Sequence, residues 1–156
     1  MEKERFTHSL EQTFSTAEIE VTTLNRLDDG TVQGNIQFRN GTISVKFDTE
    51  EESPSIADFD ALIQLLKGFL SYFNESNYES FIHDTSFQVV SDIYQQSDIT
   101  DETLKEECIN LEKNMTLKSI EIYPDGFMLV YDINFDNELL HLQLDTDYAI
   151  EDMVID

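Results

Sequence analysis

The stretch that decides the fold is residues 117–155, LKSIEIYPDGFMLVYDINFDNELLHLQLDTDYAIEDMVI. Four apolar runs of strand length alternate in it with three short turns, PDG, DNE and DTD, which are made of residues that favour tight turns. Short turns between consecutive strands are typical of an antiparallel meander. The stretch therefore predicts four sequential strands, over 117–123, 127–135, 139–144 and 148–155.

Alternation along these strands separates two faces, because successive side chains of a strand point to opposite sides of the sheet. One face is apolar and is expected to be covered; it carries Ile120, Ile122, Leu129, Tyr131, Ile133, Phe135, Leu140, Leu142 and Leu144. The other face mixes acids with polar, aromatic and apolar side chains, and it is expected to meet water; it carries Glu121, Tyr123, Met128, Val130, Asp132, Asn134, His141 and Gln143.

A second meander is predicted before residue 48. Alternating apolar residues over 18–24, 31–38 and 42–47 indicate about three strands. The pairs Asp29-Gly30 and Asn40-Gly41 favour tight hairpin turns, since these residues tolerate positive φ. Gly34 lies inside a strand, where a glycine indicates a bulge or a close backbone approach.

The middle of the chain has a helical period. Apolar residues repeat at intervals of three and four over 56–73, 75–96 and 100–115. Ser55 with Asp58 resembles a capping arrangement at the start of the first of these helices. The residues expected to be buried are Ile63, Leu66, Phe69, Val89, Ile93 and Leu111. Residues 1–13 are compatible with a short helix and equally with a loose arm.

These patterns together predict a single α+β domain over residues 1–156. Its sheet, antiparallel or mixed, combines both meanders in about six to seven strands, and about three helices pack on one face. At this length the chain is large enough to bury a sizeable core.

The chain is strongly acidic, with a net charge of −24. Residues 1–47 contribute only −2, whereas residues 48–156 hold 26 acids and four bases. Such a field repels nucleic acid and anionic membranes and attracts basic partners. Solubility alone is an equally good explanation of the acidity.

Cysteine usage and the N-terminus predict a cytoplasmic protein. Cys108 is the only cysteine, so an internal disulfide is impossible and a reducing compartment fits. The first residues, MEKERFTHSLEQ, contain no apolar run of the kind found in a signal peptide. No segment approaches the roughly 20 apolar residues that cross a bilayer.

Motifs for chemistry are weak, and no catalytic, cofactor or metal site is predicted. His83 beside Asp84 could form a base with its orienting partner, but adjacent residues on a helix point apart. Cys108 lies on an apolar stripe and is expected in the core. Asp145 and Asp147, with Glu151 and Asp152 nearby, lack the glycine of a calcium loop, so they are interpreted as turn residues.

The order of parts resembles a family of small acidic bacterial domains of unknown function, and neighbouring families that contain immunity proteins of polymorphic toxin systems. The resemblance covers residues 18–156 and rests on the hairpin QGNIQFRNGTISVKF, the acidic loop, the helices and the turn at Tyr123-Pro124-Asp125. One departure is the run DTDYAIEDMVID, which lacks a glycine between the last two strands. The resemblance implies a domain that acts by binding, and brings no catalytic residues.

The leading hypothesis is therefore a non-enzymatic binding protein, most concretely an inhibitor that masks a basic toxin surface. The alternatives are a housekeeping or regulatory domain and a metal-dependent hydrolase. The predicted partner-binding residues are Glu121, Tyr123, Met128, Asp132, Asn134, His141 and Gln143, and the predicted steering loop contains Glu50, Glu51 and Glu52. An ordinary half-wet sheet face is the simpler interpretation of the first set. No cofactor is expected.

Overall fold

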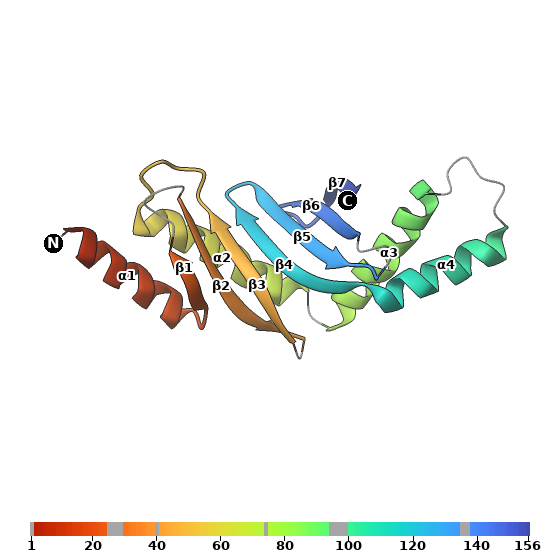
Figure 1. The fold of residues 1–156 in the computed structure, drawn as a ribbon, viewed down its shortest axis with the longest axis horizontal. Coiled ribbons are helices and arrows are strands. Elements are labelled where there is room, and N and C mark those ends of the chain that lie inside the picture. Colours follow the sequence, from red (N-terminus) through yellow and green to blue (C-terminus); the bar gives the residue numbers. More distant parts are fainter. Residues whose placement is uncertain (1, 25–29, 40, 74, 94–99, 135–137) are drawn as a thin grey trace.

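The computed structural model describes residues 2–24, 30–39, 41–73, 75–93, 100–134 and 138–156. The elements are α1 (Glu2–Thr16), β1 (Glu20–Leu24), β2 (Thr31–Phe38), β3 (Gly41–Asp48), α2 (Ile56–Tyr72), α3 (Glu75–Ile93), α4 (Asp101–Asn114), β4 (Thr116–Tyr123), β5 (Gly126–Asp132), β6 (Leu139–Asp145) and β7 (Ile150–Ile155). The predicted α+β class is confirmed (Figure 1).

Both predicted meanders belong to one seven-stranded sheet, whose strand order β1-β2-β3-β4-β5-β6-β7 follows the sequence. All neighbouring strands are antiparallel except β3 and β4, which pair in parallel, so the sheet is mixed. The three helices α2, α3 and α4 form the connection between these two strands, as a parallel pair requires a long crossover. Because β3 and β4 run in the same direction, their last residues, Asp48 and Tyr123, lie at the same end of the strands.

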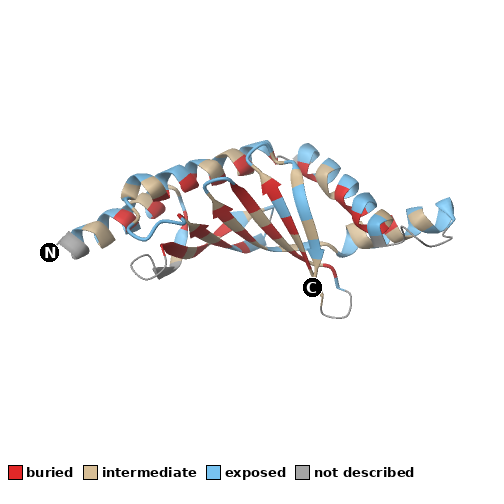
Figure 2. Ribbon diagram, turned by 90° about the horizontal axis from the view of Figure 1, so that it is seen from above, coloured by how far each residue is buried: buried red, intermediate tan, exposed pale blue. Residues whose placement is uncertain are grey.

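The helices lie along one side of the sheet, and no described helix covers the other side (Figure 2). The side that they cover is the one predicted from alternation. Its central side chains are completely enclosed: Ile120, Ile122, Leu129, Tyr131, Leu140 and Leu142 all have 0% exposure. Ile133 and Leu144 are also buried, whereas Phe135 lies outside the described residues.

α2 supplies the centre of the layer that covers the sheet. Its first turn is closed by a capping box: the Ser55 hydroxyl accepts from the Asp58 N–H at 3.2 Å, and the Ser55 N–H donates to the Asp58 carboxylate at 2.8 Å. This confirms the predicted cap. Farther along, Phe69 packs its ring 4.7 Å from that of Phe73 and 5.2 Å from that of Phe127 on β5.

The predicted count of about three helices was slightly too low, because α1 is a fourth helix; of the two alternatives for residues 1–13, the helix is the one observed from Glu2 onward. Leu10 and Phe14 on α1 are fully buried. The Phe14 ring meets the rings of Phe47 on β3 and Phe59 on α2 at centroid distances of 5.0 and 6.0 Å. This aromatic contact with the sheet and α2 is what turns a weakly patterned segment into an ordered helix.

Leu111 is only partly buried, which corrects the prediction that it belongs to the core. α4 packs against α3 at one end of the molecule and extends beyond the sheet (Figure 1), so its apolar stripe is covered by fewer neighbours. Ile63, Leu66, Phe69 and Val89 are buried as predicted. The side chain of Ile93 lies outside the described residues.

The predicted hairpin turns at Asp29-Gly30 and Asn40-Gly41 fall partly outside the described residues. Gly34 is in fact a close approach, since a Cβ there would collide with the Glu20 carbonyl of β1. The predicted strand 127–135 was too long: β5 ends at Asp132, whose carboxylate accepts the N–H of Asn134 at 2.8 Å.

The final strand exists although its preceding turn contains no glycine. Tyr148 adopts the left-handed conformation that a glycine would otherwise supply, with φ of 69°. Its ring stacks on that of Tyr72 at 4.4 Å and lies 5.9 Å from that of Phe127. We attribute the tolerance of this backbone conformation to these ring contacts, since a non-glycine residue with positive φ persists only where its surroundings hold it.

Candidate functional site

The face of the sheet opposite the helices is called the open face. It is defined by the eight residues predicted to point away from the core: Glu121, Tyr123, Met128, Val130, Asp132, Asn134, His141 and Gln143. None of them is buried. Asn134 and Gln143 are exposed, and the other six are partly exposed, as expected for a sheet face that meets solvent.

The strand register gathers part of the predicted set into one row. Glu121 on β4 pairs with Met128 on β5, which pairs with Gln143 on β6. The row continues to Lys46 on β3 and to Asp152 on β7. Since directly opposed side chains are about 5 Å apart, the row forms a continuous strip across five strands. Val130 and His141 pair in a parallel row beside it.

Two of the predicted residues lie away from this row. Asp132 is four positions farther along β5 than Met128, a distance of about 13 Å along a strand. Asn134 follows the end of β5, where it lines a groove with Leu111 of α4 and Ile155 of β7. The predicted binding residues therefore lie toward opposite ends of the strands. Asn134 leaves the row because β5 ends at Asp132, whereas the prediction continued this strand to residue 135.

Where the central strands β3 and β4 both end, the open face contains a cavity of about 240 Å³. We call it the Tyr123 cavity. It is lined by Glu50, Tyr123, Asp125, Gly126, Phe127, Met128, Gln143 and Leu144. Three predicted binding residues and one residue of the predicted steering loop therefore meet in one place.

The Tyr123 cavity is strongly acidic. Burial, together with the nearby carboxylates of Glu121, Asp48 and Glu50, raises the pKa of Tyr123 to about 12. A hydrogen bond between the Tyr123 hydroxyl and Glu121 acts in the same direction. The nearest described base in the row is Lys46, whose Nζ lies 3.7 Å from Glu121 Oε1. The cavity consequently disfavours additional negative charge and favours a cation.

The acidic loop is held in place by hydrogen bonds at its base. The buried Thr49 hydroxyl donates to the Gly30 carbonyl at 3.0 Å and accepts from the Glu51 N–H at 3.3 Å. The Asp48 carboxylate accepts from the Glu50 N–H at 2.9 Å, and Glu50 has a φ of 59°. Glu50 is thereby placed at the cavity, and Glu51 and Glu52 follow it in the loop; all three are exposed.

Sequence analysis missed Asp125 and Lys46 as members of the site. Asp125 was assigned only to a turn, although its position two residues after Tyr123 was a signal that a carboxylate accompanies the phenol. Lys46 had no comparable signal, because its proximity to Glu121 depends on the parallel pairing of strands more than 70 positions apart.

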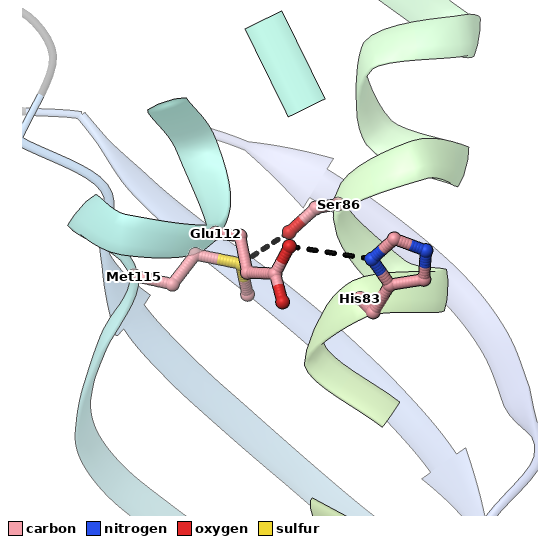
Figure 3. A network of polar contacts seen from close by, with 4 residues as sticks. All are labelled: His83, Ser86, Glu112 and Met115. Carbon is pink, nitrogen blue, oxygen red and sulfur yellow. Dashed lines mark hydrogen bonds and ion pairs between the residues drawn. The ribbon is translucent and has the colours of Figure 1, made fainter. Parts of the chain in front are cut away.

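His83 and Cys108 both make contacts within the fold. The His83 Nδ1 lies 3.3 Å from Glu112 Oε2, so its partner is on α4 and is not the adjacent Asp84 (Figure 3). One turn farther along α3, the Ser86 hydroxyl lies 3.3 Å from Met115 Sδ, a second link to the end of α4 (Figure 3). Cys108 is buried as predicted. Burial, and to a smaller extent the negative charges of Glu112 and Glu107, raises the pKa of its thiol, which disfavours the reactive thiolate.

The carboxylates before β7 are arranged as a turn. Asp145 Oδ1 accepts from the N–H groups of Asp147 and Ala149 at 2.8 and 3.0 Å, which confirms that Asp145 is a turn residue. Among the described residues, no group of three or more His, Cys, Asp or Glu side chains could hold a metal ion.

No family model, curated protein or solved structure matches this chain. Within the described part of the chain, no helix is both long enough and apolar enough to span a membrane.

Proposed function

We propose that this chain is a non-enzymatic acidic binding protein that masks a basic surface of a partner protein, most concretely a cytoplasmic immunity-type inhibitor of a toxin. The observation that supports this best is the Tyr123 cavity, where acidic residues from three segments accompany a tyrosine on a sheet face that no described helix covers. The resemblance to immunity-protein families points the same way.

The binding mode would combine charge with a small apolar centre. Tyr123 and Met128 offer contact area of the kind that is enriched in interfaces, and the surrounding acids select a basic partner. Positive surface is common on nucleases, because their substrate is a polyanion. A housekeeping or regulatory domain whose acidity serves solubility is the competing proposal.

The proposal is tested by co-expression. The gene beside this one is expected to encode a large secreted protein with a basic C-terminal domain. That domain should arrest growth of a bacterial host when expressed alone and should be tolerated when this chain is co-expressed. A housekeeping role predicts that co-expression gives no protection.

A pair of charge reversals localises the binding surface. Glu121→Lys with Asp132→Lys on the open face should abolish protection and the complex in a pull-down. Glu102→Lys with Glu106→Lys, at exposed positions of α4, changes the net charge by the same amount and should leave both intact. If both pairs behave alike, the effect is one of overall charge and the open face is not the interface. Circular dichroism of each variant checks that it is folded.

The loop containing Glu50, Glu51 and Glu52 is expected to act in two ways. Glu51 and Glu52 are exposed outside the cavity, so reversing both should slow association and weaken its salt dependence. Glu50 lines the cavity, so Glu50→Gln should mainly speed dissociation. Stopped-flow measurement of the two rate constants separates these effects. Equal effects on association would contradict the assignment of Glu50 to the contact.

A further inference from the structure

The Tyr123 cavity has a composition suited to binding a side chain of another protein. The residues that line it include the aromatic Tyr123 and the apolar Met128, both partly exposed on the open face. Its lining also includes the carboxylates of Glu50 and Asp125, and no residue that lines it is basic. A long side chain with an apolar stem and a charged end matches this combination better than a compact ion does, because apolar surface alone offers nothing to an ion.

The local charge selects a cation. The carboxylates of Glu121, Asp48 and Glu50 lie near enough to the Tyr123 phenol to act on it, and Asp125 lines the same cavity. Lys46 pairs with one of these carboxylates, since its Nζ lies 3.7 Å from Glu121 Oε1. The excess negative charge remains after this pairing. A positive group entering the cavity would therefore replace part of its hydration with carboxylate contacts in a partly enclosed place, where charge-assisted hydrogen bonds are stronger than neutral ones.

The shape of the site discriminates between the two basic side chains. A guanidinium is planar, is weakly hydrated, stacks on aromatic faces and donates through a fork of N–H groups to carboxylates. A lysine ammonium is a compact and strongly hydrated point charge. An aromatic wall with carboxylates from two different segments, the β3–α2 loop and the β4–β5 turn, suits the guanidinium.

We propose that the Tyr123 cavity binds an arginine side chain of the protein partner, with the guanidinium between the carboxylates of Glu50 and Asp125 and the methylene stem against Met128. This inference rests on the proposed function for the existence of the partner. The recognition of arginine itself is measurable without that partner.

The test uses the four methionines as reporters. The full chain is labelled with ¹³C in the methionine methyl groups and titrated with N-acetyl-arginine amide, N-acetyl-lysine amide and the uncharged N-acetyl-norleucine amide. Met128→Leu assigns the signal of interest. The arginine probe should shift the Met128 methyl in a saturable way and leave those of Met115 and Met153 in place. Its affinity should exceed that of the lysine probe several-fold, and the uncharged probe should have no effect.

Variants supply the matched comparison. Glu50→Gln with Asp125→Asn should weaken binding of the arginine probe by about tenfold or more, since each removes a charged acceptor. Glu102→Gln with Glu106→Gln on α4 removes the same charge and should leave the affinity unchanged. Movement of all methionine signals together, equal binding of the lysine or norleucine probe, or an unchanged cavity variant would each overturn the inference.

The two proposals can fail separately. A chain that binds the arginine probe but does not protect against the neighbouring toxin domain would reject immunity and retain the arginine site. A chain that protects but does not respond to the probe would retain the function and reject arginine recognition in this cavity.

Discussion

The two faces of β4, β5 and β6 are made by neighbouring residues of the same strands, yet they differ in almost every physical respect. Ile122, Leu129 and Leu142 are fully enclosed beneath the helices. Their neighbours Tyr123 and Met128 remain partly exposed and border an acidic cavity. Burial of apolar area is the main source of stability, whereas solvated charge contributes little to it. The covered face therefore holds the fold together, and the open face can change with little loss of stability.

The largest expected effect is a loss of stability on the covered side. Phe69 is fully buried among the rings of Phe38, Phe73, Phe127 and Tyr148, so Phe69→Ala should lower the free energy of unfolding by about 3–5 kcal/mol. Met128→Ala on the open face should lower it by about 1 kcal/mol or less. Urea denaturation followed by circular dichroism gives both values. Losses of similar size would remove the distinction between the two faces.

A smaller effect is expected at a polar pair within the aromatic part of the core. The hydroxyl groups of Tyr78 on α3 and Tyr131 on β5 lie 2.8 Å apart and are buried. Tyr131→Phe or Tyr78→Phe alone should cost about 1–3 kcal/mol, because the remaining hydroxyl loses its partner. The double variant should cost less than the sum of the two. A double-mutant cycle measures this coupling, and strict additivity would show that the hydrogen bond contributes nothing.

On the open face, alkaline titration should reveal the acidic surroundings of Tyr123. Its pKa is raised from 10 to about 12, so the folded state favours the neutral phenol. The resulting contribution to stability is complete below about pH 10, the usual tyrosine pKa, and is lost as the pH rises through the folded value. Ultraviolet absorbance of tyrosinate, compared between the wild type and Tyr123→Phe, isolates this ionisation. Titration of Tyr123 near pH 10 would contradict the description of the cavity.

The smallest effect is expected from calcium. Asp145 Oδ1 already accepts two backbone N–H groups, so the turn before β7 is complete without a metal ion. Millimolar calcium should leave the melting temperature unchanged, both in the wild type and in Asp147→Asn. A rise that saturates at micromolar calcium and disappears in Asp147→Asn would demonstrate a specific site, because a ligand of the native state must stabilise it.

Much of the architecture was predictable because the signals are local. Alternation along β4, β5 and β6 separates the two faces correctly, since the direction of a strand side chain depends only on its parity. The Ser55 and Asp58 cap and the stripe containing Leu66 and Phe69 also act within a few residues. These patterns determined the class, the core and the exposed face on which the candidate site lies.

Tertiary structure alone decided what meets on that face. The parallel pairing of β3 with β4 places Glu50 and Lys46 near residues of β4, although more than 70 positions separate the paired segments. Other long-range contacts act in the same way: Phe14 packs on Phe47 and anchors α1, and the Tyr148 ring, at a residue with positive φ, stacks on that of Tyr72. Periodicity contains no information about which distant segments will pair, since that choice depends on the packing of the whole chain. The faces were therefore determined by the sequence itself, and the cavity by the fold.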